Sequence, residues 1–175
     1  MTEPAKLPVL FSESDIRARV AALADEIVAL RDRPNLALPI LVGAFVFAAD
    51  LLRALDERGL PLPVEFLQLR SYGEARVAQD EIRVLLGPGE SVRGRHILLI
   101  DGVLDGGRTL KTARNLAIAA GARAVTSAVA IDKRRREALL QADFAAFAHV
   151  EHFVAGYGMD DAGRLRSLPY IAVMD

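Results

Sequence analysis

The segment "LLIDGVLDGGRTL", residues 98–110, contains two aspartates and a pair of glycines whose spacing is suited to a catalytic or ligand-binding site. Asp101 and Asp105 follow an apolar run, and Gly106-Gly107 lead into a predicted helix. Glycines at such a junction let backbone N–H groups approach a ligand, and the helix N-terminus adds free donors and a favourable dipole. With the Thr109 hydroxyl, these groups could hold a phosphate monoester. The lysine and the spacing of a Walker motif are absent.

The two carboxylates indicate which phosphate such a cradle could take. Acids beside an anion site repel the ligand unless they serve its hydroxyls, a metal ion or a proton transfer. A sugar phosphate with free hydroxyls meets that condition. The spacing alone leaves open a simpler interpretation, in which Gly106-Gly107 form only a tight turn from strand to helix.

Apolar runs and glycine punctuation predict the elements that position this motif. Ile16, Val20, Leu23 and Ile27 recur on one helical face, Ser12 is the expected N-cap, and Gly59 is the expected C-cap of the next helix. A polar stretch at residues 74–81 is expected to be a loop. We expect helices within residues 12–34 and at 44–59, 109–121 and 135–142, and strands at 38–43, 63–73, 82–86, 95–101, 124–132, near Val150 and at 170–174.

Strands that alternate with helices predict an α/β fold with a mainly parallel sheet covered on both faces. In such sheets, ligands bind beyond the carboxyl ends of the strands, and the motif at 101–109 lies at such an end. No repeat or linker divides the sequence, so we expect a single domain over residues 1–175.

Composition limits the partners. The formal net charge is -1, so no global field attracts nucleic acid or an anionic membrane. The sequence has no cysteine and no long apolar run, which fits a reducing compartment and argues against membrane spans. We expect a cytoplasmic protein that binds neither nucleic acid nor membranes.

The segment "HILLIDGVLDGGRTL" resembles the phosphoribosyl diphosphate signature of the type I phosphoribosyltransferases, and most of all that of their hypoxanthine-guanine branch. Four other segments resemble this branch in order: "LPILVGAFVFAADLLRAL", "FLQLRSYG", "AVAIDKR" and "HFVAGYGMDDAGRLRSLPYIAV". The resemblance implies the Rossmann-like fold of that family, with a small hood and a flexible loop. It also implies purine salvage: Mg²⁺-dependent transfer of 5-phosphoribosyl to a 6-oxopurine, hypoxanthine or guanine, which gives a nucleoside monophosphate and pyrophosphate. Family members form homodimers or homotetramers, and we expect the same here.

The resemblance also implies roles for individual residues that bind the phosphoribosyl diphosphate. Asp105 would be the base or the hydrogen-bond acceptor at purine N7, and Asp101 would contact a ribose hydroxyl. Four segments would make the remaining contacts with the diphosphate: the cradle, a pyrophosphate loop, the flexible loop and the C-terminal segment. In this family the pyrophosphate loop often holds a non-proline cis peptide. The contacting residues are Gly106, Gly107, Arg108 and Thr109 in the cradle, Val42 and Gly43 in the pyrophosphate loop, Ser71 and Tyr72 in the flexible loop, and Arg166.

On the purine side, the resemblance implies that Lys133 donates to the 6-oxo group, Phe153 stacks on the base and Val154 meets its edge. Asp160 lies on the same side and would help to hold Mg²⁺, with Asp101 as a second metal contact. Each has a simpler interpretation without the resemblance. Lys133 begins the run "KRRR", which often is a solvated helix start, and Phe153 could belong to the core.

Three positions depart from the family pattern. Gly102 stands where a second acid is usual, Val42 where lysine or arginine is common, and Gly106 where threonine or serine is usual. The missing acid predicts weaker diphosphate binding, because a charge-assisted hydrogen bond contributes roughly 1.5–3 kcal/mol. The departures leave open two other functions: a weak or inactive nucleotide-sensing regulatory protein on the same fold, or another sugar-phosphate enzyme.

Overall fold

The computed structural model describes residues 7–72 and 81–174, and the side chains of Ser71, Tyr72 and Glu81 lie outside this description. The loop expected at residues 74–81 therefore falls outside the described residues, apart from the backbone of Glu81. Within the described part, no helix combines the length and the apolar character needed to cross a membrane.

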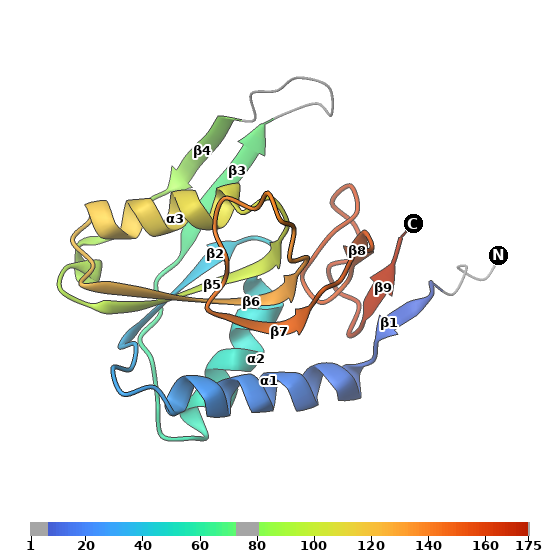
Figure 1. The fold of residues 1–175 in the computed structure, drawn as a ribbon, viewed down its shortest axis with the longest axis horizontal. Coiled ribbons are helices and arrows are strands. Elements are labelled where there is room, and N and C mark those ends of the chain that lie inside the picture. The colour runs from blue at the N-terminus through green and yellow to red at the C-terminus, as the bar shows by residue number, and fades with distance from the viewer. Residues whose placement is uncertain (1–6, 73–80, 175) are drawn as a thin grey trace.

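A six-stranded sheet forms the centre of the structure (Figure 1), and its strands run in the order β4-β3-β2-β5-β6-β7. All neighbours in it are parallel except β3 and β4, which pair antiparallel. The mainly parallel sheet predicted from the sequence is thus confirmed. The strands are β2 (Leu36–Leu41), β3 (Leu67–Tyr72), β4 (Glu81–Leu86), β5 (His96–Leu104), β6 (Ala124–Asp132) and β7 (Phe144–Ala148).

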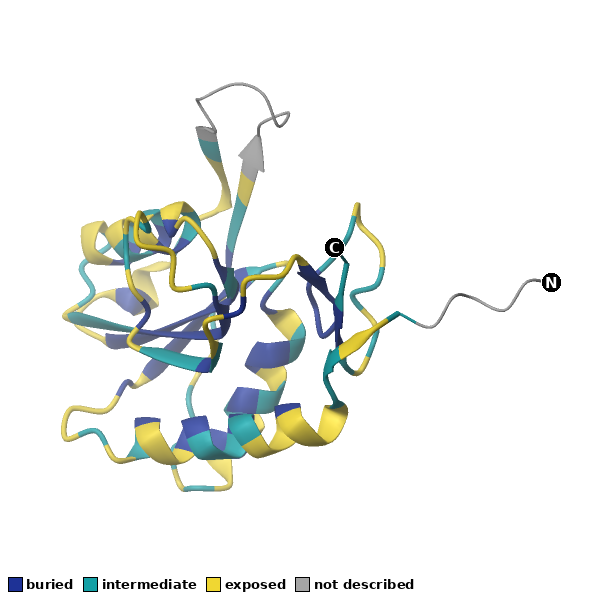
Figure 2. Cartoon of the chain, turned by 45° about the vertical axis from the view of Figure 1, so that its right-hand side comes forward, coloured by how far each residue is buried: buried dark blue, intermediate teal, exposed yellow. Residues whose placement is uncertain are grey.

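Helices cover both faces of the sheet. Helices α1 (Glu13–Val28) and α2 (Phe45–Asp56) lie on one face, and α3 (Arg108–Ala119) lies on the other (Figure 1). Figure 2 shows the buried residues concentrated on the central strands and on the helix faces turned toward them. The apolar residues predicted to share one side of α1 are buried, as that pattern requires: Ile16, Val20, Leu23 and Ile27.

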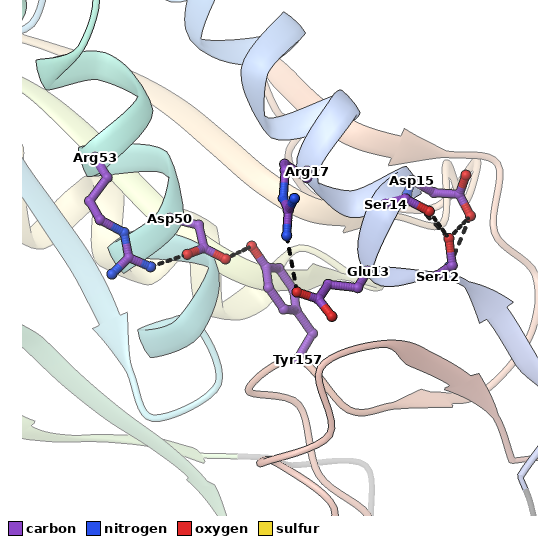
Figure 3. Close-up of polar contacts among 8 residues, drawn as sticks. All are labelled: Ser12, Glu13, Ser14, Asp15, Arg17, Asp50, Arg53 and Tyr157. Carbon is purple, nitrogen blue, oxygen red and sulfur yellow. Dashed lines mark hydrogen bonds and ion pairs between the residues drawn. The ribbon is translucent and has the colours of Figure 1, made fainter.

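The helix ends follow the local signals in the sequence. Ser12 accepts a hydrogen bond from the backbone N–H of Asp15, whose carboxylate accepts from the N–H of Ser12, so a capping box starts α1. The Ser12 hydroxyl also donates to the Asp15 carboxylate (Figure 3). Helix α2 stops at Asp56, three residues before the expected C-cap. Gly59 has a left-handed φ of 77°, and the N–H of Leu60 donates to the carbonyl of Leu55. Gly59 therefore closes the turn that follows the helix.

The helix expected at residues 135–142 is wrong. This stretch forms an irregular loop between β6 and β7. Two backbone donors of this loop bind another part of the chain: the N–H of Lys133, just before the stretch, donates to the carbonyl of Leu104, and the N–H of Leu139 donates to the carbonyl of Gly106. These bonds fix the loop in a conformation that helical hydrogen bonding cannot share.

A second, antiparallel sheet of three short strands stands at the carboxyl end of the central sheet, where the resemblance implied a small hood (Figure 1). Its strands are β1 (Val9–Phe11), β9 (Ile171–Val173) and β8 (Val154–Ala155), in that order. The strand expected at 170–174 is confirmed, whereas β1 was not predicted. A 3₁₀ turn at Glu90–Val92 completes the described elements.

Candidate functional site

The glycine and aspartate motif lies where β5 passes into α3. The strand does not end at Asp101 as expected, because Val103 and Leu104 continue the parallel pairing with β6. Asp101 therefore lies inside β5, and Asp105 is the first residue after it. Both line a cleft of about 270 Å³ at the carboxyl end of the sheet, which Gly43, Lys133, Phe153 and Arg166 also line.

Asp101 is a buried carboxyl group. Its side chain is only 8% exposed, and its Oδ1 accepts a hydrogen bond of 2.7 Å from the backbone N–H of Gly102. Burial raises the pKa of Asp101 to about 7, against the smaller opposing effect of that hydrogen bond. Near neutral pH the group is partly protonated, so it can both donate to and accept from a sugar hydroxyl.

Asp105 is half exposed and lies between two cations. The Nζ atom of Lys133 is 3.6 Å from its Oδ2, and the guanidinium of Arg135 contacts both of its carboxylate oxygens. The Lys133 side chain is only 8% exposed, so the alternative of a solvated helix start is wrong. Asp105 and Lys133 thus present an acceptor and a donor to the same cleft.

A cradle of backbone groups follows Asp105. Gly107 caps α3 with a left-handed φ of 76°, and residues 105–110 line a second hollow of about 410 Å³ that also contains Asp101. A Cβ atom on Gly107 would stand 3.0 Å from the backbone nitrogen of Leu140. Both the left-handed φ and this lack of space favour glycine at position 107. Thr109 lines both hollows, whereas Arg108 lines only the second. The cradle suits a phosphate at the start of a helix.

The loop between β2 and α2 approaches β5 very closely. The Leu41–Val42 peptide bond is cis, as the resemblance implied for a pyrophosphate loop. The carbonyl oxygen of Gly43 lies 2.9 Å from the position of a Cβ atom on Gly102 and 2.8 Å from that of one on Gly158. This loop can therefore reach the cleft only because both neighbours are glycines. Val42 is exposed and is not among the residues that line the cleft; it lines a neighbouring hollow with Asp160 and Arg166.

Residues of β8 and the C-terminal segment close the other side of the cleft. Phe153 is 49% exposed at its rim, so it is not a core residue, while Val154 is buried. Arg166 donates to the carbonyl of Gly158 at 2.7 Å and pairs with Asp160 at 2.6 Å. The arginine therefore ties the backbone beside the pyrophosphate loop to an acid at the cleft.

The structure brings together most of the residues that the resemblance assigned. Ser71 and Tyr72 end β3, but their side chains lie outside the described residues. Sequence reasoning missed Arg135, Tyr157 and Met159. Met159 lines the cleft, and the Tyr157 hydroxyl donates to Asp50 of α2 at 2.7 Å (Figure 3). The run "KRRR" is the one signal in the sequence for Arg135, and taken alone it predicts the start of a helix.

The carboxylates at the cleft determine how a metal ion could bind there. The described residues contain no group of three or more acids and histidines close enough to hold one alone. Asp160 offers a partly exposed carboxylate, and Asp101 a partly protonated one. Mg²⁺ typically binds through one or two carboxylates together with substrate phosphates and waters. These residues fit a magnesium ion that arrives with a diphosphate.

The profile of the phosphoribosyl transferase domain matches residues 12–162. The chain is 36% identical over 168 residues to a hypoxanthine-guanine phosphoribosyltransferase of Bacillus subtilis, which covers 95% of this chain and 92% of that protein. It is 31% identical to a hypoxanthine phosphoribosyltransferase of Haemophilus influenzae, over 93% and 92% of the two chains.

Solved structures agree with these relatives. The hypoxanthine phosphoribosyltransferase of Trypanosoma cruzi, in complex with the product IMP, superimposes with a TM-score of 0.85 at 30% identity, over 100% of this chain and 98% of that one. The similarity thus covers the central sheet, the small sheet and the cleft between them.

Proposed function

Because this chain belongs to the phosphoribosyltransferase family, on its hypoxanthine-guanine branch and with the type I fold, we propose that it transfers 5-phosphoribosyl from phosphoribosyl diphosphate to hypoxanthine or guanine in purine salvage. The observation that carries the proposal is the pairing of Asp105 with Lys133 beside the Gly106–Thr109 cradle. An acceptor and a donor stand together there, next to a site for a sugar phosphate.

The residues divide the substrate among them. The backbone of the cradle and the Thr109 hydroxyl hold the 5-phosphate, and Asp101 meets a ribose hydroxyl. Arg166 lies on the side of the pyrophosphate loop and binds the leaving group. Phe153 stacks on the base, and Lys133 donates to the 6-oxo group that hypoxanthine and guanine share. The edge of the purine meets backbone atoms near Val154, which leaves room for either base.

The transfer forms one bond and breaks another. Purine N9 bonds to C1 of the ribose, the bond from C1 to the pyrophosphate oxygen breaks, and pyrophosphate leaves with the electron pair. The proton on N7 passes to Asp105. A carboxylate is a far weaker base than a purine anion, so this proton moves only as the N–C bond forms and acidifies the ring. Positioning and exclusion of water therefore supply most of the rate.

Magnesium is the cofactor we propose, with Asp160 and Asp101 as its protein contacts. When bound with the diphosphate, it neutralises charge on the leaving group. Arg166 works in the same direction, since its guanidinium carries a permanent charge beside the cleft. Asp160 already pairs with Arg166 through Oδ1 and accepts from the N–H of Gly163 through Oδ2, and its remaining lone pairs would be the ones that hold the ion.

The departures at Gly102, Val42 and Gly106 favour a second candidate, a nucleotide-sensing regulatory protein that binds the product without turnover. The two functions separate in one experiment. Purified protein with phosphoribosyl diphosphate is mixed with hypoxanthine, guanine, xanthine or adenine, with Mg²⁺ and with a chelator. We expect nucleotide from hypoxanthine and guanine with Mg²⁺ alone. No nucleotide from any base would overturn the enzyme, and tight binding of inosine monophosphate would then favour the regulator.

The cellular setting remains as the sequence predicts it. We propose a cytoplasmic homodimer or homotetramer whose partners are the diphosphate, the purine base and the nucleoside monophosphate.

A further inference from the structure

The run of three arginines after Lys133 places each of them in a different environment. Arg134 turns back to the buried Asp132, with its Nε 2.9 Å from Oδ2 and its backbone N–H 2.7 Å from Oδ1. Arg135 pairs through Nε with Oδ1 of Asp105, and its Nη2 lies 3.5 Å from Oδ2. Arg136 is exposed, and it makes no ion pair with any residue that the structure describes. The loop thus aims one arginine of the three at the carboxylate.

Backbone hydrogen bonds on both sides of Asp105 hold the loop in the position from which Arg135 contacts it. The N–H of Lys133 donates to Leu104 at 3.0 Å, and the N–H of Leu139 donates to Gly106 at 3.0 Å. The loop is therefore attached one residue before and one residue after Asp105, and Arg135 stands between the two attachments. Arg134 has a left-handed φ of 49°, and the turn at this residue precedes the contact of Arg135 with Asp105.

Asp105 needs such a partner, because it is half exposed at the end of a strand. A short carboxylate in that position is free to rotate and to bind water. A guanidinium fork that touches both oxygens fixes the plane of the carboxylate, which a point charge such as the Lys133 ammonium at 3.6 Å does less well. A carboxylate has about four lone-pair sites, so one remains for a purine proton.

We propose that Arg135 is a positioning residue for the transfer: it holds the Asp105 carboxylate in the orientation that receives the N7 proton. The inference rests on the proposed function. It gives Arg135 no direct contact with the diphosphate, because Arg135 does not line the cradle hollow that holds the 5-phosphate.

The test compares Arg135→Gln with Arg136→Gln, a matched change one residue along the same loop. Arg135→Lys is a third variant, which keeps the charge and loses the fork. Each is measured for kcat, for the KM of hypoxanthine and of phosphoribosyl diphosphate, and for melting temperature. We expect Arg135→Gln to lower kcat about tenfold, the factor that ~1.4 kcal/mol produces, with an unchanged KM for the diphosphate. Arg135→Lys should recover part of the loss, and Arg136→Gln should behave as the wild type.

The outcomes separate two failures. If the wild type transfers phosphoribosyl and Arg135→Gln matches Arg136→Gln within twofold, the positioning role is wrong. It is also wrong if the loss falls on the KM of the diphosphate. If the wild type transfers nothing to any base, the proposed function itself fails, and the role of Arg135 with it. If Arg135→Gln melts at a lower temperature than the wild type, the kinetic constants of Arg135→Lys are compared with those of Arg136→Gln in its place.

Discussion

The carbonyl oxygen of Gly43 lies 2.9 Å from the point that a Cβ atom on Gly102 would occupy. The pyrophosphate loop therefore packs directly on the residue that replaces the family's second acid. Seen from the sequence, Gly102 is a lost carboxylate. In the structure, the space that a side chain at position 102 would occupy is filled by the loop. A side chain there must therefore displace backbone atoms of Gly43, which move less easily than the end of a flexible side chain.

Gly102→Ala should lower the free energy of unfolding by roughly 1–3 kcal/mol, because an added methyl group overpacks a rigid contact. Urea denaturation followed by circular dichroism measures this. Gly106→Ala is the matched control for stability, since a Cβ atom there has nothing within 4 Å. Equal stability of the two variants would show that the loop yields easily to a side chain at position 102.

Gly102→Asp should raise the KM for phosphoribosyl diphosphate and not lower it. The added carboxylate must displace the Gly43 carbonyl, and the loop for which we propose pyrophosphate binding moves with it. Steady-state kinetics with varied diphosphate at saturating hypoxanthine measures the change. A fall in this KM would show that the missing charge matters more than the space.

Asp101 gives the unfolding free energy a pH dependence. Burial raises its pKa to about 7, above the unfolded value of about 3.9, so the folded protein binds the extra proton between these two values. Its contribution to stability is fully present below pH 4 and is lost as the pH rises to 7. Asparagine does not titrate in this range. The free energy of unfolding of Asp101→Asn, minus that of the wild type, should therefore increase by on the order of 3 kcal/mol between pH 5 and pH 8.

Urea denaturation of wild type and Asp101→Asn at several pH values in this range checks the prediction. The carboxyl of Asp32 does not interfere, because its pairing with Arg123 lowers its pKa to about 2 and its effect falls below pH 4. Parallel stability profiles for the two proteins would contradict the assignment of a buried, easily protonated Asp101.

Tyr157→Phe should destabilise the fold by about 1.5 kcal/mol through loss of the hydrogen bond to Asp50, which joins the C-terminal segment to α2 (Figure 3). Burial, and next that hydrogen bond, raise the pKa of the Tyr157 hydroxyl, as expected of a neutral donor. The phenylalanine ring keeps the edge contact with Phe47. Tyr170→Phe is the control, because the described residues offer its hydroxyl no hydrogen bond. A loss of the same size in both variants would rule out a specific effect.

The sequence predicted most of the central sheet because its signals are local. Buried parallel strands are apolar without alternation, and glycines such as Gly59 and Gly121 follow the helices with the left-handed φ that glycine adopts readily. The place of Asp105 just after the carboxyl end of β5 followed from that pattern, whereas Asp101 lies inside the strand, which is longer than predicted.

What the sequence could not predict depends on distant partners. A helix was expected at residues 135–142, but the loop between β6 and β7 is hydrogen-bonded through its backbone to Leu104 and Gly106, some thirty residues earlier in the chain. Strand β1 has only three residues and exists through its pairing with β9, at the other end of the chain. The close contact of Gly43 with Gly102 likewise joins a loop to a strand that no local pattern relates to it.

Formation of inosine monophosphate from hypoxanthine and phosphoribosyl diphosphate, in wild type and in Asp105→Asn, tests the central claim most directly. The amide cannot accept the N7 proton as a carboxylate does, so we predict that kcat falls about 10²- to 10⁴-fold while the protein still binds the diphosphate. Turnover by Asp105→Asn equal to that of an active wild type would contradict the account, and so would a wild type that makes no inosine monophosphate.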